Sequence, residues 1–270
     1  MVNDKMVHGL IFSAGLGTRL KPLTDTMPKA LVPLAGKPLL QWQVEKLRDA
    51  GITDIIVNVH HFPDMIIDAI RQNNGWGCNI QISDERDCLL DTGGGLRKAL
   101  NIQSPVTGNP SPILACNVDI LSNIDLKALI HRYEQTGVSQ LVVSDRPTQR
   151  YLLFDEQNTL CGWTNIATGE VKPASLTNDQ LLTTNYRKLA FSGMQVLSPV
   201  IFDHMDRVVA EKGDKFSLVD LYLSVCEEAL LPSSFHFSTS LKAYVPSDYR
   251  MMDVGKIDQI EEAERFAESL

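Results

Sequence analysis

The chain has 270 residues, of which 44% are hydrophobic, so it can bury a sizeable core as one large α/β domain or two small ones. A balance of 25 basic and 33 acidic residues gives a formal net charge of -8, which excludes the basic surface that binding to a nucleic-acid backbone requires. Five scattered cysteines without C-x-x-C spacing argue against a disulfide framework and a zinc site, and we expect them to be reduced core thiols.

Strands and helices alternate through the first half of the chain. The apolar run at 7–13 predicts a buried strand, and apolar residues at helical spacing predict a helix over 38–50 that Gly51 ends. The same patterns predict further strands at 54–60, 79–83 and 113–116, and helices at 63–73, from Gly95 to about residue 100, and at 125–135. This alternation indicates a parallel sheet with right-handed crossovers.

The alternation stops after a strand predicted at 138–144. Short strands joined by turn residues are predicted at 151–154 and 160–163, and the polar, weakly periodic segment 164–187 is predicted to be a cap over a site. A strand at 188–196, helices near 198–205 and 217–229, a strand pair near Phe235 and Ala243, and a helix from Lys256 complete the pattern.

One domain spanning residues 1–270 is the simplest organisation, because no internal repeat, low-complexity tract or clean linker divides the chain. The sequence has no secretory leader pattern and no apolar run of the ~18 residues or more that crossing a bilayer requires. We therefore expect a cytoplasmic protein without a membrane partner.

The glycine-rich loop Gly15-Leu-Gly-Thr-Arg-Leu20 directly follows the first strand, a position that is typical of phosphate binding. A dinucleotide fingerprint needs a third glycine where Leu20 stands, and no P-loop motif occurs in the chain, so these two readings are excluded. A simple tight turn remains possible. Against it stand three cations close together in an otherwise acidic chain, namely Arg19, Lys21 and Lys29.

This cluster suits a triphosphate. Backbone N–H groups of residues 15–18 can form an anion-binding nest, and the forked guanidinium of Arg19 can meet β- and γ-phosphate oxygens in a bidentate manner. Lys29 can act as a point charge on the reacting phosphate. Any one of these cations alone would be read as a solvated surface residue, but the set predicts a phosphate site.

Longer motifs carry a resemblance to a known family. The runs GLGTRLKPLT at 15–24 and PKALVPLAGKPL at 28–39 resemble the N-terminal signature of the sugar-1-phosphate nucleotidylyltransferases. The similarity extends through DTGGG at 91–95, FSG at 191–193, KFSL at 215–218 and MDVG at 252–255, hence over nearly the whole chain.

The resemblance implies a fold, a reaction and a cofactor. The fold is a three-layer α/β/α architecture with a Rossmann-like, mixed but mostly parallel sheet of the nucleotide-diphospho-sugar transferase type, with a sugar-side excursion around 145–190. The reaction joins a sugar 1-phosphate to a nucleoside triphosphate and releases pyrophosphate, so charge neutralisation dominates its catalysis. Mg²⁺ is the implied cofactor, with Asp119 and Asp253 as its ligands. Asp119 follows a buried strand, at the sheet edge where such folds bind ligands.

The matching motifs assign roles to individual residues. Arg19, Lys29 and Asp119 are the catalytic candidates. The candidates for nucleotide binding are Ala14, Gly15, Gly17, Thr18, Arg19, Thr92, Gly93 and Gly94, where the glycines at 93–95 would let the backbone approach a flat base. The candidates for sugar-phosphate binding are Lys29, Asn117, Arg146, Gly193 and Lys215.

Two departures from the family pattern affect the pocket. Val118 stands where many members have glycine before the first aspartate, which puts the local pocket shape in question but leaves metal binding by Asp119 unaffected. A Glu-Lys-Pro motif that many relatives use for the sugar phosphate is missing, and Ser-Asp-Arg146-Pro holds its place. Arg146 is therefore either a sugar-phosphate ligand or a surface cation packed on Tyr151.

Within the family, the compact length and the Thr-Gly-Gly-Gly segment are most similar to members that use UTP and N-acetylmuramate 1-phosphate in cell-wall nucleotide-sugar synthesis. Guanylyl transfer to mannose or heptose 1-phosphate is the alternative, and a catalytically silent regulatory homologue is the rival from another class. The expected partners are a nucleoside triphosphate, UTP or GTP, and a sugar 1-phosphate, in a monomer or a small homo-oligomer.

Overall fold

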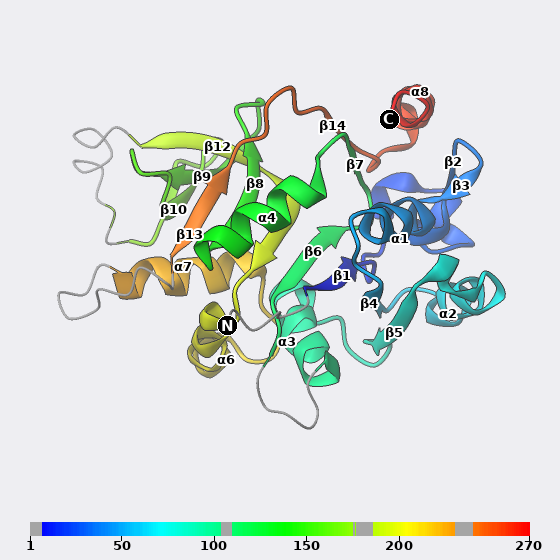
Figure 1. Cartoon of the computed structure of the whole chain (residues 1–270), viewed down its shortest axis with the longest axis horizontal. Helices are drawn as coiled ribbons and strands as arrows, with labels where there is room; N and C mark the ends of the chain where they lie inside the picture. The colour runs from blue at the N-terminus through cyan, green and yellow to red at the C-terminus, as the bar shows by residue number, and fades with distance from the viewer. Residues whose placement is uncertain (1–6, 104–109, 175, 177–185, 230–239) are drawn as a thin grey trace.

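The computed structural model describes residues 7–103, 110–174, 176, 186–229 and 240–270. Its centre is a 10-stranded mixed sheet whose main path runs in the order β11-β10-β9-β12-β6-β1-β4-β5, with β8 and β13 branching from β12 (Figure 1). The strands are β1 (His8–Phe12), β4 (Asp54–Val59), β5 (Asn79–Asp84), β6 (Ile113–Asn117), β8 (Ser139–Ser144), β9 (Arg150–Phe154), β10 (Leu160–Asn165), β11 (Glu170–Lys172), β12 (Arg187–Leu197) and β13 (Leu241–Tyr244).

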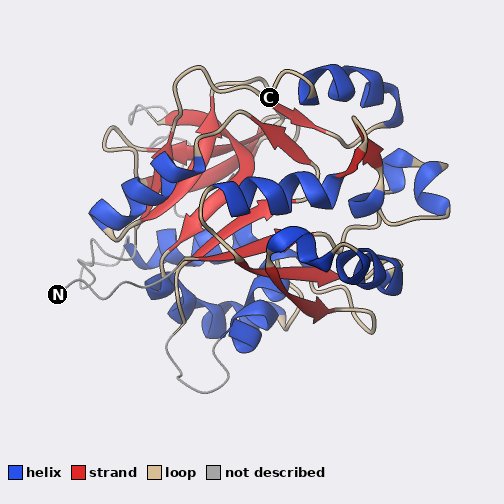
Figure 2. Cartoon of the chain, turned by 45° about the vertical axis from the view of Figure 1, so that its right-hand side comes forward, coloured by secondary structure: helices blue, strands red, loops and turns tan. Residues whose placement is uncertain are grey.

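Helices cover both faces of the sheet (Figure 2). One apolar core contains residues of α1 (Leu39–Asp49), α2 (Pro63–Gln72), α4 (Leu126–Thr136) and α8 (Ile260–Ala267). The other contains residues of α3 (Asp91–Gln103), α6 (Met205–Lys212) and α7 (Leu218–Ala229). Alternate residues of β1 enter opposite cores, Ile11 the first and Leu10 the second, as the period of a strand requires. The expected three-layer, mostly parallel architecture of β1, β4, β5 and β6 is confirmed.

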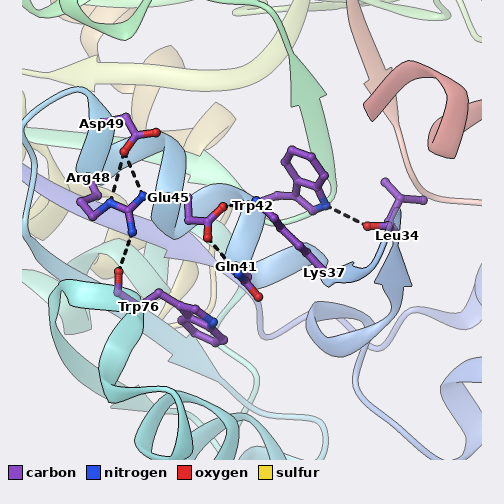
Figure 3. A network of polar contacts seen from close by, with 8 residues as sticks. All are labelled: Leu34, Lys37, Gln41, Trp42, Glu45, Arg48, Asp49 and Trp76. Carbon is purple, nitrogen blue, oxygen red and sulfur yellow. Dashed lines mark hydrogen bonds and ion pairs between the residues drawn. The ribbon is translucent and has the colours of Figure 1, made fainter. Parts of the chain in front are cut away.

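The first helix is fixed to its neighbours by polar contacts along its outer face (Figure 3). Trp42 donates its indole N–H to the carbonyl of Leu34 at 3.0 Å, which ties α1 to the small hairpin of β2 (Pro33–Leu34) and β3 (Lys37–Pro38). Arg48 donates to the carbonyl of Trp76 at 2.9 Å, in the short 3-10 turn that precedes β5. These contacts fix α1 against the β2–β3 hairpin and the turn before β5.

β12 joins the two halves of the sheet. It pairs with β9 through Arg187–Leu189, with β8 through Ala190–Val196 and with β6 through Met194–Leu197, all antiparallel. Its register against β8 shifts between Phe191 and Gln195, and Gly193 inside this bulge has φ of +73°. A side chain at Gly193 would place its Cβ 2.9 Å from Asn117 Nδ2, so only glycine fits between β12 and the end of β6.

Several expected boundaries differ from the structure. α3 begins at Asp91 and includes the three glycines in its first turns, whereas we expected the helix to follow them. The helix expected near 198–205 is a 3-10 turn (Pro199–His204) that continues into α6. β13, near Ala243, pairs with β8 in parallel, and the expected partner strand near Phe235 lies outside the described residues.

The segment predicted as a cap, 164–187, is partly a sheet edge. Its first part completes β10 and forms β11, an antiparallel pair at the end of the main sheet path. Residues 175 and 177–185 lie outside the described part of the chain. Among the described residues no helix combines the length and the apolar composition that a membrane span requires.

All five cysteines are free. The expectation of core thiols holds for Cys116 and Cys226, which are buried, whereas Cys78 and Cys161 are half-buried and Cys88 is exposed. Burial raises the pKa of the Cys116 thiol to about 12, so this cysteine stays protonated.

Candidate active site

A cavity of about 510 Å³ lies beyond the carboxyl ends of β1, β4 and β6, the edge at which α/β sheets bind ligands. The loop after β1, the segment around α3 and the end of β6 contribute most of its walls. Its lining residues are Phe12, Ser13, Ala14, Gly15, Gly17, Thr18, Arg19, Lys29, Asn58, Glu85, Leu89, Asp91, Thr92, Asn117, Val118, Asp119, Lys215 and Gly255.

The loop after β1 presents backbone to this cavity. Gly17 adopts a left-handed conformation, with φ of +64°, and caps the short 3-10 helix Thr18–Leu20. Thr24 fixes this turn by donating its hydroxyl to the Gly17 carbonyl at 2.8 Å. A Cβ at Gly15 would meet no protein atom within 4 Å, so the glycine there leaves open space rather than satisfying a packing constraint. The loop therefore has the form of an anion site, a fixed turn with exposed backbone beside Arg19.

Two ion pairs lie at this site, and three of their four side chains line the cavity, all but Asp253. Lys29, whose side chain is only 10% exposed, forms a hydrogen-bonded ion pair with Asp119, which is 19% exposed. Arg19 Nη2 lies 3.8 Å from Asp253 Oδ2, and both of these side chains are about half exposed. Each of the two cations expected to bind phosphate is thus paired with one of the two carboxylates expected to bind metal. The site therefore carries positive groups that suit phosphates and negative groups that suit a metal ion.

A short antiparallel pair brings the two aspartates together. β7 (Ile120–Ser122) pairs with β14 (Met251–Asp253), and Asp253 stands opposite Ile120. The backbone N–H of Val254 donates to the Asp119 carbonyl at 2.8 Å, which extends the pairing by one position. Desolvation, reinforced by the nearby charge of Asp119, raises the pKa of the Asp253 carboxyl. This like-charge proximity is the environment that a divalent cation would relieve.

Gly255 closes the wall behind Arg19. A Cβ at this position would lie 2.6 Å from Asp253 Oδ1 and 2.8 Å from Arg19 Nη2. Glycine is therefore required because the carboxylate and the guanidinium occupy the space of a side chain. Sequence reasoning quoted Gly255 only as part of the motif and did not assign it a role.

A buried polar network forms another wall, and sequence reasoning missed it. Asn58 accepts from the Ser13 N–H at 2.6 Å and donates to Glu85 Oε1 at 2.8 Å. Glu85 is 1% exposed, and its other oxygen accepts from the Leu90 N–H at 3.1 Å. Asn58 lies near the end of β4 and Glu85 directly follows β5, so polar residues at strand ends were the available signal.

The glycines of α3 lie against protein rather than in the open cavity. The N–H groups of Gly93 and Gly94 donate to the Phe216 carbonyl at 2.9 and 3.1 Å. Added Cβ atoms would lie 2.4 Å from the Phe216 ring at Gly93 and 2.3 Å from the Asp214 carbonyl at Gly94. Neither glycine lines the cavity, whereas Thr92, next to them, does. The structure thus gives these glycines a packing reason, the close approach of α3 and the segment before α7.

The sugar-phosphate candidates divide into two groups. Lys29, Asn117 and Lys215 line the cavity, and Gly193 supports Asn117 from behind. Arg146 lies outside this cavity, where its Nη2 donates to the Phe191 carbonyl at 2.9 Å. Val118, the departure from the family pattern before Asp119, is buried, 4% exposed, and contributes apolar surface to the cavity wall.

The donor set fits a hard divalent cation that also binds phosphate. No group of three or more His, Cys, Asp or Glu side chains gathers anywhere in the described part of the chain, which speaks against an all-protein cage there. Asp119 and Asp253 offer two carboxylates beside a phosphate-binding loop. Mg²⁺ is held by one or two carboxylates together with substrate phosphates and water, and this pair suits that pattern.

Comparison with known proteins places the chain among nucleotidyltransferases. N-acetylmuramate alpha-1-phosphate uridylyltransferase of Neisseria meningitidis is 41% identical over 122 residues, 45% of this chain and 51% of the relative. Mannose-1-phosphate guanyltransferase 2 of Candida glabrata is 32% identical over 157 residues, 57% of this chain and 42% of the relative. The aligned region spans about half the length of these curated relatives.

Solved structures share the fold over almost the whole chain. Apo UDP-glucose pyrophosphorylase superposes with a TM-score of 0.71 at 18% identity, covering 98% of this chain and 100% of that one. HddC from Yersinia pseudotuberculosis, in complex with GMP-PN, superposes with a TM-score of 0.67 at 23% identity, covering 97% and 100%. The sheet is therefore that of the nucleotide-diphospho-sugar transferase fold. The family model described as nucleotidyl transferase matches residues 8–269, and the chain belongs to this family.

Proposed function

We propose that this protein is an Mg²⁺-dependent uridylyltransferase that converts UTP and N-acetylmuramate 1-phosphate into the nucleotide sugar and pyrophosphate. The observation that carries the proposal is the pairing of Lys29 with Asp119 and of Arg19 with Asp253 at one cavity. This arrangement supplies two cations for phosphates and two carboxylates for a metal within one site. The uridylyltransferase of Neisseria meningitidis, 41% identical over its aligned region, supports the choice of substrates.

Each residue has a definite task in this reaction. The loop backbone at 15–18 and Arg19 bind the β- and γ-phosphates, which leave as pyrophosphate. Lys29 holds the sugar phosphate and the α-phosphate close together, so that the attacking oxygen and the phosphorus are in contact distance. Asp119 and Asp253 would hold Mg²⁺, which when bound neutralises charge on the phosphates.

The surrounding residues orient the substrates. Asp91 and Thr92 line the end of the cavity toward α3, and the buried Glu85 and Asn58 offer polar atoms to a base there. Asn117 lies on the wall nearest β12, next to Gly193, and Lys215 also lines the cavity; these two residues would contact the sugar phosphate. No covalent protein intermediate is needed, because the sugar phosphate oxygen itself attacks the α-phosphorus.

Guanylyl transfer is the second candidate, and Glu85 is the observation in its favour. A carboxylate acceptor can pair with the N–H groups on the edge of guanine, and Glu85 lines the cavity. Its two oxygens already accept from Asn58 and Leu90, which leaves fewer lone pairs for a guanine than an open carboxylate would offer. UTP is therefore our first choice. A silent regulatory role is disfavoured because Arg19, Lys29, Asp119 and Asp253 are all brought to one site.

Pyrophosphate release tests the proposal. The purified protein, mixed with Mg²⁺, UTP and N-acetylmuramate 1-phosphate, should release pyrophosphate and form the corresponding UDP-sugar, detected by mass spectrometry. GTP with mannose 1-phosphate should react at least tenfold more slowly. The reverse preference would establish the guanylyl alternative. If neither UTP nor GTP reacts with any sugar 1-phosphate, the enzyme reading is refuted.

A further inference from the structure

A second cavity, of about 220 Å³, is lined by residues of β9, β10, β12 and the start of α7 together with the segment before β9. We call it the arginine pocket, and its lining residues are Arg146, Thr148, Arg150, Tyr151, Leu152, Trp163, Phe191, Val219 and Tyr222. The segment that leads into α7 reaches both cavities, because Lys215, just before the helix, lines the first and Val219, in its first turn, lines the second. β12 connects them as well, since Phe191 lines the arginine pocket and Gly193 supports Asn117 in the first cavity.

The charged side chains that line the arginine pocket are all positive. Its walls carry two arginines and no acidic residue, in a chain whose net charge is -8. Neither Arg146 nor Arg150 forms an ion pair with any described residue. The Arg146 guanidinium is oriented by its hydrogen bond to the Phe191 carbonyl, and its Nε is buried without a hydrogen-bond partner. A buried donor of this kind is costly to leave unsatisfied, so the pocket calls for an acceptor from a ligand.

The remaining walls are apolar and aromatic. Phe191 and Tyr222 pack edge to face, with ring centroids 6.4 Å apart, and the Tyr222 hydroxyl is already used in a hydrogen bond to Gln195. Tyr151 and Trp163 complete the aromatic lining. Aromatic rings suit the apolar faces of a sugar or a short alkyl group, while the arginines suit an anion.

From these features we infer that the arginine pocket binds a carboxylate carried by the sugar 1-phosphate, so that Arg146 and Arg150 select acidic sugars over neutral ones. This inference rests on the proposed function. The 1-phosphate must stay beside Lys29 and Asp119 to react, so the anion at the arginine pocket is a different group of the same substrate. The lactyl ether of N-acetylmuramate is such a carboxylate with a short alkyl portion, and mannose 1-phosphate has none.

Kinetics with a matched pair of substrates test the inference. N-acetylmuramate 1-phosphate and N-acetylglucosamine 1-phosphate differ only in the lactyl group, so the ratio of their kcat/KM values measures recognition of the carboxylate. We expect the native protein to favour the acidic sugar at least tenfold. The substitutions R146M and R150M should each reduce this ratio at least fivefold, mainly through KM for the acidic sugar, and R146K should restore part of it.

A control variant and a defined negative result complete the test. R132M removes an arginine that is exposed on α4 and should leave the ratio unchanged. If pyrophosphate is released but the native ratio is near one, or if it is the same in R146M and R150M as in R132M, the carboxylate inference is overturned while the proposed function stands. If no sugar phosphate reacts at all, the proposed function has failed instead. Thermal unfolding of each variant shows whether R146M is folded, and R150M carries the test if it is not.

Discussion

At the residue scale, the site is built from charges that satisfy one another before any substrate binds. Lys29 neutralises Asp119 in a nearly buried ion pair, and Arg19 lies near Asp253 at the more exposed end. In the proposed reaction, phosphate groups would compete for the cations and a metal ion would compete for the carboxylates. The same four side chains pair with one another in the substrate-free protein and would provide the charges for that reaction.

Replacing the Asp119 carboxylate should remove most of the turnover but leave the protein folded. Asp119→Asn keeps the shape of the side chain but removes the negative charge that would hold Mg²⁺, so we expect pyrophosphate release to fall at least a hundredfold. Lys29 would then lie nearly buried beside a neutral amide, which costs stability, so the thermal midpoint should fall while the protein still folds. Asp87→Asn, at an exposed residue that does not line the cavity, is the control and should stay active. An active D119N protein would remove Asp119 from the metal site.

Gly255→Ala tests how closely the charged pair is packed. The new Cβ would lie 2.6 Å from Asp253 Oδ1 and 2.8 Å from Arg19 Nη2, so both side chains must move. Because these side chains are about half exposed, we expect a small loss of stability but at least a tenfold loss in kcat/KM. Steady-state kinetics measure the loss in kcat/KM, and thermal unfolding of the same sample measures the loss of stability. Unchanged kinetics would mean that Arg19 and Asp253 do not need their observed positions.

At the element scale, regular alternation was readable from sequence and short pairings were not. Apolar runs bounded by turns predicted the strands that became β1, β4 and β6. β7 and β14 have three residues each, too few for a periodic signal, and the residues they pair are far apart in the chain. The sequence therefore suggested Asp119 and Asp253 through motif resemblance, while their proximity depends on a strand register that no local pattern reveals.

The packing of the glycines in α3 is another feature that the sequence pattern did not predict. Three consecutive glycines predicted an approach of backbone to a base, but Gly94 instead lies against the backbone of Asp214. Likewise, the buried acceptor Glu85 reads as an ordinary surface residue in the run Asp-Glu-Arg-Asp. Which partner fills a glycine's empty space, and which charged residue becomes buried, depends on tertiary packing: Gly94 meets the distant Asp214, and Glu85 is enclosed with Asn58 and Leu90.

Gly94→Ala should therefore act on stability. Its Cβ would lie 2.3 Å from the Asp214 carbonyl, a backbone atom that cannot rotate away. We expect a loss of about 1–3 kcal/mol in the free energy of unfolding, larger than the helix-propensity gain of about 1 kcal/mol from replacing glycine. Urea denaturation measures it. A variant with native stability and a raised KM for UTP would show that this glycine serves the nucleotide directly.

Lys46 links α1 to β7, and its titration should be visible in stability. Burial lowers the pKa of its ammonium from 10.5 to about 8, and it donates to the carbonyl and hydroxyl of Ser122. Between these two pKa values the unfolded chain binds more protons than the folded one, so this residue makes stability rise with pH. The unfolding free energy of the native protein, relative to K46M, should increase by about 1 kcal/mol from pH 7.5 to pH 9. A pH-independent difference would contradict this assignment.

At the scale of the whole molecule, the two cavities are built on different parts of the sheet. The first cavity lies over β1, β4 and β6 in the first half of the chain, and the arginine pocket lies beside β9 and β12 in the second half. The segment that leads into α7 lines both cavities, and β12 lines the arginine pocket and approaches Asn117 of the first cavity at Gly193. A nucleotide in the first cavity and a sugar reaching toward the second would thus meet at Lys29, Asp119 and Lys215.

The presence of two cations and two carboxylates at one site predicts that UTP and Mg²⁺ bind cooperatively. UTP with a chelator places phosphates near Asp119 and Asp253, and Mg²⁺ alone places a cation near Lys29 and Arg19, so each ligand alone meets repulsion. When both ligands bind, the cations pair with the phosphates and the carboxylates pair with the metal ion. Since a ligand stabilises the folded state by about 2.7 kcal/mol at 100 times its Kd, we expect the thermal midpoint to rise by several degrees with both. That rise should exceed the sum of the separate shifts in the native protein but not in D119N, and strictly additive shifts in the native protein would show that the site does not couple the two ligands.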